Sequence, residues 1–277
     1  MPIAAVFGLV VGSFLNVVVL RLPVMLERRW RAMAHETLNE NKKPRRKEKT
    51  FNLATPPSHC PTCGHQIRAW ENVPVLSFLW LGRKCSACGT AISWRYPLLE
   101  LCSGILAAAV AWRFGPGWET LAALVFTWSL LALAFIDYDT QLLPDDITLP
   151  LLWIGLLANT QQLFAPLSSA VIGAAAGYLT FWLVYQAFKL LTGKEGMGFG
   201  DFKLLAALGA WLGWQQLPLI VLLSSFLGAV IGIGFIVLKG RDRRLPIPYG
   251  PFLCIAGWTA LMWGDAMTRY YFYLVRY

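Results

Sequence analysis

Charge is scarce in this sequence. Asp, Glu, Lys and Arg make up 14% of the 277 residues, whereas a soluble domain holds about 25%. Hydrophobic residues reach 57%, and the mean hydropathy is +0.53. This composition excludes a single soluble core and predicts a membrane protein that crosses the bilayer several times.

Histidine is scarcer still, and its placement excludes some chemistry. His35, His59 and His65 all lie between residues 21 and 95. The apolar remainder of the chain therefore has no base for Ser-His-Asp catalysis, and a Cys nucleophile has only His59 beside Cys60. The sequence also lacks a strand followed by a Gly-x-Gly-x-x-Gly turn, the usual mark of a dinucleotide site.

What the chain does contain is a series of apolar runs, broken by Gly, Pro and polar clusters. Their number predicts an all-α polytopic membrane protein with about eight transmembrane helices. The sixth run is short for a full crossing, so we expect it to be tilted or half-buried. The runs cover Ile3–Leu20, Pro97–Trp112, Trp118–Ile136, Ile147–Leu163, Leu167–Leu190, Phe202–Leu212, Leu217–Leu238 and Pro251–Tyr273.

The first run starts almost at Met1, without the basic segment of a cleavable signal peptide, so we expect none. Gly8, Gly12 and Ser13 give this run a small-residue face for close helix contact. For Asn16, its one strongly polar residue, we expect an interhelical hydrogen bond, with a role in a functional site as the alternative. The predicted domains are a first helix (1–20), a cytoplasmic insert (21–95) and a seven-helix core (96–277).

The insert is strongly basic at its start. Residues 21–50 carry ten Lys and Arg against four Glu, and residues 39–50 have the composition of a disordered or surface-bound segment. In a chain this apolar, such a segment indicates contact with lipid headgroups rather than with nucleic acid.

Two Cys pairs follow inside the insert. Cys60 and Cys63 form one Cys-x-x-Cys pair, Cys85 and Cys88 form a second after 21 residues, and each pair is followed by Gly. This spacing is typical of a structural zinc ribbon. Disulfides compete with zinc, but a cytoplasmic insert disfavours them; free or redox-active thiols remain the alternative. Two further Cys residues, Cys102 and Cys254, lie in apolar runs and are predicted to be plain core residues. His65 is predicted to be a solvated residue rather than a metal ligand.

The charges also predict orientation. With the N-terminus outside, 21 of the 24 Lys and Arg lie in inside segments, and only Arg113, Arg269 and Arg276 lie outside. This distribution follows the positive-inside rule and places the insert in the cytoplasm.

Two acidic positions then share one membrane face. Asp137 follows the third run, and the chain crosses out and back before Asp201 opens the sixth run on the same side. Two such carboxylates can activate one water for peptide hydrolysis if they share a proton. The alternatives are structural: Asp201 as a helix N-cap after a Gly breaker, and Asp137 as a loop acid, a capping role better suited to Asp145 or Asp146.

The segment before Asp201 is rich in glycine. Gly196, Gly198 and Gly200 alternate, so in an extended conformation they would expose one edge of backbone. An extended peptide substrate could pair with that edge as an added strand.

Several motifs together resemble the bacterial type IV prepilin peptidases, bifunctional leader peptidases of pilus and type II secretion systems. The resemblance covers nearly the whole chain. Its motifs are Gly12–Val18 with Arg21–Pro23, the paired Cys-x-x-Cys, Asp137–Asp139 through Leu142–Asp145, Gly193–Leu204 and Ile247–Phe252. A longer first span is expected in that family, so we expect the start of this chain to be trimmed or misassigned.

The resemblance implies that Asp137 and Asp201 are catalytic aspartates of a Gly-x-Gly-Asp membrane protease in the bacterial inner membrane, with the active site facing the cytoplasm. It implies removal of a short basic leader from prepilins and pseudopilins, then methylation of the new N-terminal residue with S-adenosylmethionine. Five acids, Asp137, Asp139, Asp145, Asp146 and Asp201, would attract the leader. No residue is assigned to S-adenosylmethionine, for which the insert is one candidate region.

Two other functions are compatible with parts of the pattern. A proton-coupled transporter would also place acids in broken helices, although these acids lie at run ends rather than at mid-bilayer. A non-enzymatic assembly scaffold could be built on the zinc module alone. The sequence gives no oligomeric state.

Overall fold

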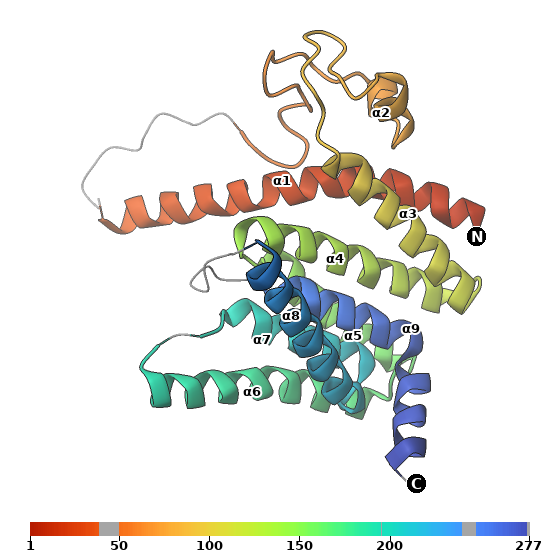
Figure 1. Cartoon of the computed structure of the whole chain (residues 1–277), viewed down its shortest axis with the longest axis vertical. Coiled ribbons are helices and arrows are strands. Elements are labelled where there is room, and N and C mark those ends of the chain that lie inside the picture. The colour runs from red at the N-terminus through yellow and green to blue at the C-terminus, as the bar shows by residue number, and fades with distance from the viewer. Residues whose placement is uncertain (39–49, 195, 240–247, 276–277) are drawn as a thin grey trace. The chain divides into compact units, whose positions relative to one another are not determined.

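The computed structural model describes residues 1–38, 50–194, 196–239 and 248–275 (Figure 1). The described residues form helices, and β-structure is limited to two isolated bridges. The predicted all-α class is confirmed. Most of the segment 39–50, predicted to be disordered or surface-bound, lies outside the described residues. Contacts divide the chain into two compact units, Met1–Trp112 and Arg113–Tyr277.

Helices of fourteen or more residues occur at all eight predicted runs. Their bounds are α1 Pro2–Leu38, α3 Arg95–Phe114, α4 Trp118–Thr140, α5 Asp145–Thr160, α6 Leu167–Thr192, α7 Phe199–Leu212, α8 Leu217–Lys239 and α9 Gly250–Val275. Five stretches in the described part are long and apolar enough to cross a membrane: α1, α3, α4, α6 and Trp214–Gly234. The count of eight spans therefore stays a prediction.

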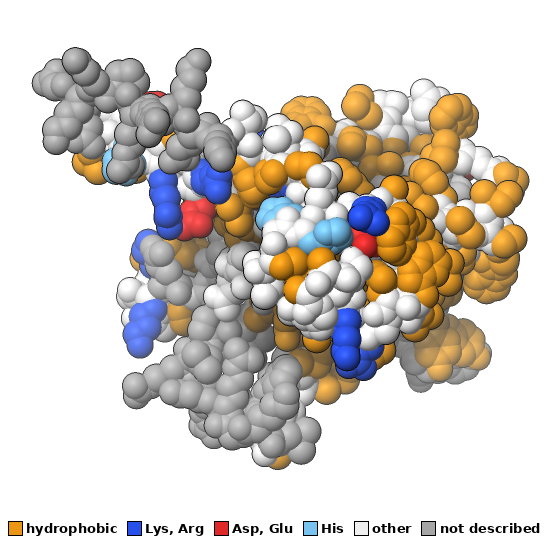
Figure 2. Space-filling view, turned by 90° about the horizontal axis from the view of Figure 1, so that it is seen from above, with side chains coloured by type: hydrophobic (Ala, Val, Ile, Leu, Met, Phe, Trp, Pro, Cys, Tyr) orange, Lys and Arg blue, Asp and Glu red, His pale blue; other side chains and the backbone are white. Residues whose placement is uncertain are grey.

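The surface also has the character expected of a membrane protein. Large apolar side chains are exposed on many helices, for example Ile3 at 83%, Leu190 at 86% and Val237 at 74%. Hydrophobic side chains cover much of the face shown in Figure 2. Water would disfavour so much apolar surface, whereas lipid tails would cover it.

In the first unit, α1 and α3 pack through small residues. A Cβ atom at Gly8 would lie 2.7 Å from Ala107 Cβ, and one at Gly12 would lie 2.7 Å from Glu100 Cα. Asn16 donates its predicted interhelical hydrogen bond to the Tyr96 carbonyl, at 3.2 Å. The small-residue face is thus the contact that the sequence predicts.

Helix α1 continues well beyond the predicted boundary at residue 20. It runs to Leu38 with Pro23 inside it, and Leu22 and Leu26 are each 7% exposed. These buried leucines extend the apolar face of the helix into the segment that its charges assigned to the insert. The same unit contains η1 (Ala69–Asn72) and α2 (Leu76–Trp80). The contacts also group α3 with this unit, whereas the predicted core starts at residue 96.

Helix α7 is the centre of the second unit. Ten of its fourteen residues are buried, and it contacts α5, α6 and α9. Neighbouring helices thus enclose this short run, whereas its predicted tilt or partial insertion in the bilayer stays a prediction. Trp211, fully buried, donates from Nε1 to the Leu151 carbonyl at 2.7 Å. Asn159 donates to the carbonyls of Ala210 and Trp211, both at 2.9 Å, and so ties α5 to the end of α7.

Helices α6 and α7 cross at glycines. A Cβ at Gly173 would lie 2.4 Å from the Gly209 carbonyl oxygen, and a Cβ at Gly177 would lie 2.6 Å from the Leu205 carbonyl oxygen. Gly173 and Gly177 form a Gly-x-x-x-Gly motif, which allows backbones to approach closely. This motif is visible in the sequence but was not used in the prediction.

The close approach of α6 and α7 at these glycines leads to a prediction about the stability of the protein. Gly209→Ala places a Cβ 2.1 Å from the Gly173 carbonyl oxygen, so the two backbones must separate. We expect a loss of about 1–3 kcal/mol of stability, the usual cost of overpacking. Thermal unfolding in detergent measures it against Gly234→Ala, a helical glycine whose added Cβ meets nothing within 4 Å. Equal unfolding midpoints for the two variants would contradict the close crossing.

Candidate active site and metal centre

Asp137 lies inside α4 rather than after it. The helix continues four residues past the predicted end at Ile136 and stops at Thr140. Gln141 ends it in the left-handed conformation, with its amide donating to the Asp137 carbonyl at 2.9 Å. The Asp137 side chain is buried, at 5% exposure, and its Oδ2 accepts a hydrogen bond from the Gly250 amide at 2.9 Å. The carboxylate is thus held by the first residue of α9.

Asp201 lies in the first turn of α7. Phe199 is the first helical residue, Gly198 is the N-cap residue, and no side chain caps the helix. The Asp201 amide instead donates to the Gly198 carbonyl at 3.2 Å. The alternative that Asp201 is the N-cap residue is therefore wrong, although its carboxylate lies near the Gly198 backbone in the first turn of the helix.

The glycine segment is not one extended edge. Gly198 is extended, with φ −80° and ψ 145°, but Gly200 belongs to α7. The predicted extended run of alternating glycines ends there, because Gly200 packs against Leu143. A Cβ on Gly200 would lie 2.8 Å from Leu143 Cβ. Only the part before Phe199 lies outside the helix, so the substrate edge that we predicted is shorter than the motif.

Three contacts bring the two acids to one place. Leu143 lies against Gly200, the neighbour of Asp201, and also against Gly250, the partner of Asp137; a Cβ on Gly250 would lie 3.1 Å from Leu143 Cδ2. The third contact is the hydrogen bond from the Gly250 amide to the Asp137 carboxylate. The end of α4 and the starts of α7 and α9 lie together at one end of the second unit (Figure 1).

The other acids near this end differ in their environment. Asp145, at the start of α5, forms an ion pair with Lys203 of α7, with both carboxylate oxygens 2.7 Å from Nζ. Asp139 and Asp146 are exposed. Only Asp137 and Asp201 combine shelter from solvent with mutual proximity, which is the arrangement that makes two carboxylates share a proton.

Residues that sequence reasoning assigned no role also form this site. Gly250 supplies the amide to Asp137, and Cys254 lies one turn further along α9. The hydroxyl groups of Tyr249 and of Ser224, which is on α8, form a hydrogen bond at 2.7 Å. The Tyr249-Gly250-Pro251 motif was the available signal, because a glycine before a helix can admit a close neighbour.

The four Cys residues of the insert form a compact cluster. Their Sγ atoms all lie within 4.8 Å of one another. Cys60 and Cys88 are 3.8 Å apart, and Cys63 and Cys85 are 4.0 Å apart. Four sulfurs placed about 2.3 Å from one tetrahedral ion would be roughly 3.8 Å apart. The donor set and its spacing therefore fit a metal ion.

The two halves of the cluster repeat the same backbone turn. The Gly64 amide donates to the Cys60 carbonyl at 2.9 Å, and the Gly89 amide donates to the Cys85 carbonyl at 3.0 Å. Both glycines have positive φ, 72° and 71°, a conformation that glycine adopts without strain. The predicted role of each Gly as the turn residue of a metal-binding knuckle agrees with this geometry.

Nearby groups prepare and support the cluster. Hydrogen bonds to the side chain and backbone of Thr90 lower the pKa of the Cys88 thiol to about 6, so its thiolate forms readily. His65 is not a ligand: its Nε2 lies 3.2 Å from Glu71 Oε2. Glu71 also accepts from Ser86 Oγ at 2.6 Å, and thereby links the two knuckles. All six Cys residues are free thiols.

Comparisons with known proteins agree over both units. The model of the bacterial peptidase A24 N-terminal domain matches residues 6–114, and the type IV leader peptidase family matches residues 124–233. No solved structure matches the chain.

Curated relatives match nearly end to end, and each is a prepilin leader peptidase/N-methyltransferase. The relative from Aeromonas salmonicida is 58% identical over 96% of this chain and 91% of its own length. Those from Pseudomonas aeruginosa and Neisseria gonorrhoeae are 58% and 52% identical, over 95% and 97% of this chain and 90% and 92% of their own lengths. The chain therefore belongs to the type IV leader peptidase family.

Proposed function

We propose that Asp137 and Asp201 are the catalytic pair of an aspartic endopeptidase in the membrane. The observation that carries this proposal is the shared junction around Leu143, where α4, α7 and α9 bring the two carboxylates together. Family membership supports a peptidase, and the relatives' name supports prepilins as its substrates.

The two acids would divide the chemistry between them. The ionised carboxylate takes a proton from water while the water oxygen attacks the scissile carbonyl carbon. The protonated carboxyl donates its proton to the carbonyl oxygen. The tetrahedral intermediate then collapses: the carbon–nitrogen bond breaks as the carboxyl that took the water proton gives it to the leaving amine. The other carboxylate recovers a proton from a hydroxyl of the intermediate, which restores the starting state of the pair. The Gly250 amide would hold Asp137 in the orientation that this exchange requires.

The proposed substrate is the short basic leader of a prepilin or pseudopilin, presented at the cytoplasmic face. The orientation rests on the 21 of 24 basic residues that fall in the predicted inside segments. The exposed Asp139 and Asp146 would attract a cationic leader. Asp145 contributes less than the sequence predicted, because Lys203 already neutralises it.

The relatives' name also supports a second activity, methylation of the new N-terminal amine with S-adenosylmethionine. The cavity lined by Arg113 and Arg269 does not fit this role, because it lies at the end of α7 opposite Asp201, away from the new N-terminal amine. The described residues therefore support no methyl-transfer step.

For the Cys cluster we propose structural zinc. Four thiolates in a tetrahedral arrangement satisfy the ion completely, which is the arrangement of closed structural sites. Of the four cysteines in the cluster, only Cys60 is buried, so this segment has little apolar core. A bound ion would hold the segment together. Cys60, Cys63, Cys85 and Cys88 would all be ligands.

A cleavage assay separates this function from a transporter and from a scaffold. Purified protein in detergent is incubated with a full-length prepilin, and the products are identified by mass spectrometry. We expect removal of the leader at one bond, which the resemblance to prepilin peptidases implies to follow a glycine. A matched prepilin with that glycine replaced by a bulky residue serves as the control. Intact prepilin after prolonged incubation would favour the two non-enzymatic functions.

Gly250 provides a sharper test of the geometry. A Cβ on this residue would lie 2.7 Å from Asp137 Oδ2 and 3.0 Å from its Cγ. Gly250→Ala should therefore displace the carboxylate and lower kcat about 10–100-fold, because misplacement by an ångström is this costly. Gly234→Ala, with open space around its Cβ, should cleave like the parent. Unchanged kcat in Gly250→Ala would show that this amide does not position Asp137.

A further inference from the structure

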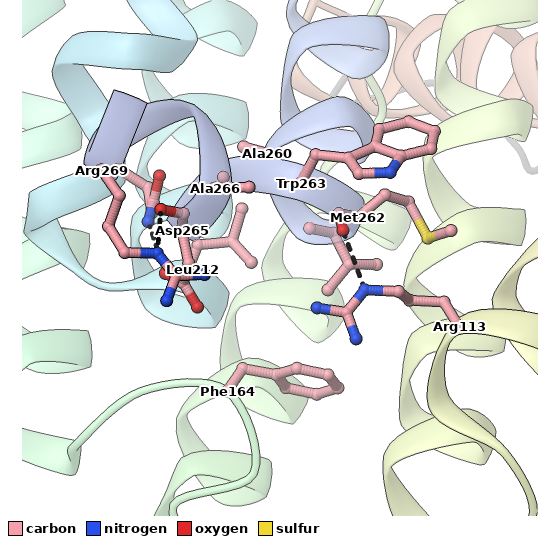
Figure 3. Close-up of a pocket in the computed structure, with 12 residues that line it drawn as sticks. Arg113, Phe164, Leu212, Ala260, Met262, Trp263, Asp265, Ala266 and Arg269 are labelled. Atoms are coloured by element: carbon pink, nitrogen blue, oxygen red, sulfur yellow. Dashed lines mark hydrogen bonds between the residues drawn. The ribbon is translucent and has the colours of Figure 1, made fainter. Parts of the chain in front are cut away.

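A cavity of about 150 Å³ lies at the far end of the second unit from the two aspartates. Leu212, the last residue of α7, lines it, whereas Asp201 is in the first turn of that helix. The eleven steps along the helix from Asp201 to Leu212 correspond to roughly 16 Å. Figure 3 shows Arg113 and Arg269 on either side of the cavity, with Phe164 below them. The cavity is therefore no part of the proposed active site, and the predicted topology puts Arg113 and Arg269 at the opposite membrane face.

Both arginines are held in place without being neutralised. Arg113 donates from Nε to the Met262 carbonyl at 3.1 Å, and Arg269 donates from Nε to the Asp265 carbonyl at 3.2 Å (Figure 3). Neither guanidinium forms an ion pair with any described residue. Their terminal nitrogens remain available, and two such groups flanking one space are suited to a phosphate.

The cavity also contains an acceptor that lacks a donor. Gln216, 8% exposed, donates from Nε2 to Asp265 Oδ1 at 3.2 Å. A carboxylate only accepts, so this bond fixes the amide with its oxygen on the other side. That oxygen, Oε1, is buried and has no partner. Gly264 packs directly against this amide, since a Cβ there would lie 2.7 Å from Oε1. An unpaired buried acceptor costs free energy unless a ligand supplies the donor.

The lining thus requires two opposite features in one ligand. The arginines call for an anion, whereas Gln216 Oε1 and the Asp265 carboxylate call for a cation that donates hydrogen bonds. A phosphate joined to a primary ammonium has both features. Trp263, 44% exposed, stands at the rim, where Trp is typical of the headgroup level.

We propose that this cavity binds the headgroup of an aminophospholipid, phosphatidylethanolamine being the simplest. The phosphate lies between Arg113 and Arg269, and the ammonium donates to Gln216 Oε1. The acyl chains then follow the apolar outer surface of the helices into the bilayer. This site is independent of the proposed peptidase chemistry.

Native mass spectrometry of the purified full chain tests the proposal. The protein in detergent is titrated with phosphatidylethanolamine, phosphatidylcholine and phosphatidylglycerol that carry the same acyl chains. We expect the first to bind about tenfold or more tightly than the other two, because only its headgroup can donate from a cation to Gln216 and Asp265. Equal affinities would overturn the proposal. Free O-phosphoethanolamine or inorganic phosphate binding as tightly as the lipid would also overturn it, by identifying a soluble ligand.

Substitutions of the lining residues test each proposed contact with the headgroup. Arg113→Gln and Arg269→Gln should weaken all three lipids, whereas Asp265→Asn and Gly264→Ala should remove only the preference for ethanolamine over choline. Glu119→Gln is the control, since Glu119 starts α4 and is not among the residues that line the cavity. A preference that survives both Asp265→Asn and Gly264→Ala would contradict the assignment. If a variant fails to fold, the lipid series on the parent protein still decides.

Discussion

Replacing either Asp137 or Asp201 by Asn should abolish leader removal, with a loss of roughly 10³-fold or more in kcat. Asn keeps the size of the side chain but can neither take a proton from water nor give one to the carbonyl, and each proton transfer contributes about 10²–10⁴-fold. The double variant should be no worse than either single one, because the two acids act as a unit. Quantitative mass spectrometry of prepilin cleavage gives the rates.

Asp139→Asn is the matched control for this experiment. Asp139 is two residues from Asp137 on the same helix but is exposed, so its loss should change the rate by only a few-fold through weaker attraction of the leader. Full cleavage by Asp137→Asn or by Asp201→Asn would refute the paired mechanism. A loss of the same size in all three variants would point instead to a role for the local charge.

Removing the metal should unfold the Cys module and leave the second unit intact. Structural zinc supplies about 10–16 kcal/mol of apparent binding free energy to small metal-bound domains, more than such a module can replace with apolar burial. We expect about one zinc ion per chain in the parent protein and almost none in Cys60→Ser. Limited proteolysis should then cut within residues 52–94, while α4 to α9 stay protected.

Cys102→Ser serves as the control, because Cys102 lies in α3, outside the cluster, and should leave the zinc content unchanged. Acid should release the ion as the thiolates become protonated. A freshly purified parent protein without zinc, or one whose Cys pairs are oxidised to disulfides, would rule out the proposed metal centre.

The sequence predicted local features better than close contacts. The four Cys residues with their glycines were predictable because a metal knuckle is built within a few residues of chain. The apolar runs likewise predicted the helices, since lipid requires continuous apolar surface. The end of α1 was missed because Leu22 and Leu26 were read with the basic residues around them rather than by their burial.

The tertiary contacts around Asp137 and Asp201 could not be predicted from the sequence pattern. Run spacing placed Asp137 and Asp201 on one membrane face, but Leu143 and Gly250 join them through tertiary packing. The assignment of Gly200 to an extended edge failed for the same reason. Its lack of a side chain serves a close approach to Leu143 rather than an exposed backbone, and a glycine alone does not distinguish these uses.

Helix α7 also constrains the biogenesis of the protein. Its fourteen residues span about 21 Å, less than the hydrocarbon thickness of about 30 Å, so it gains little by entering lipid alone. It needs α5, α6 and α9 around it, and α9 follows the other two along the chain. The Gly250 amide that holds Asp137 is supplied by that later helix. The proposed catalytic pair can therefore be completed only after α9 has been synthesised and has packed against α4 and α7.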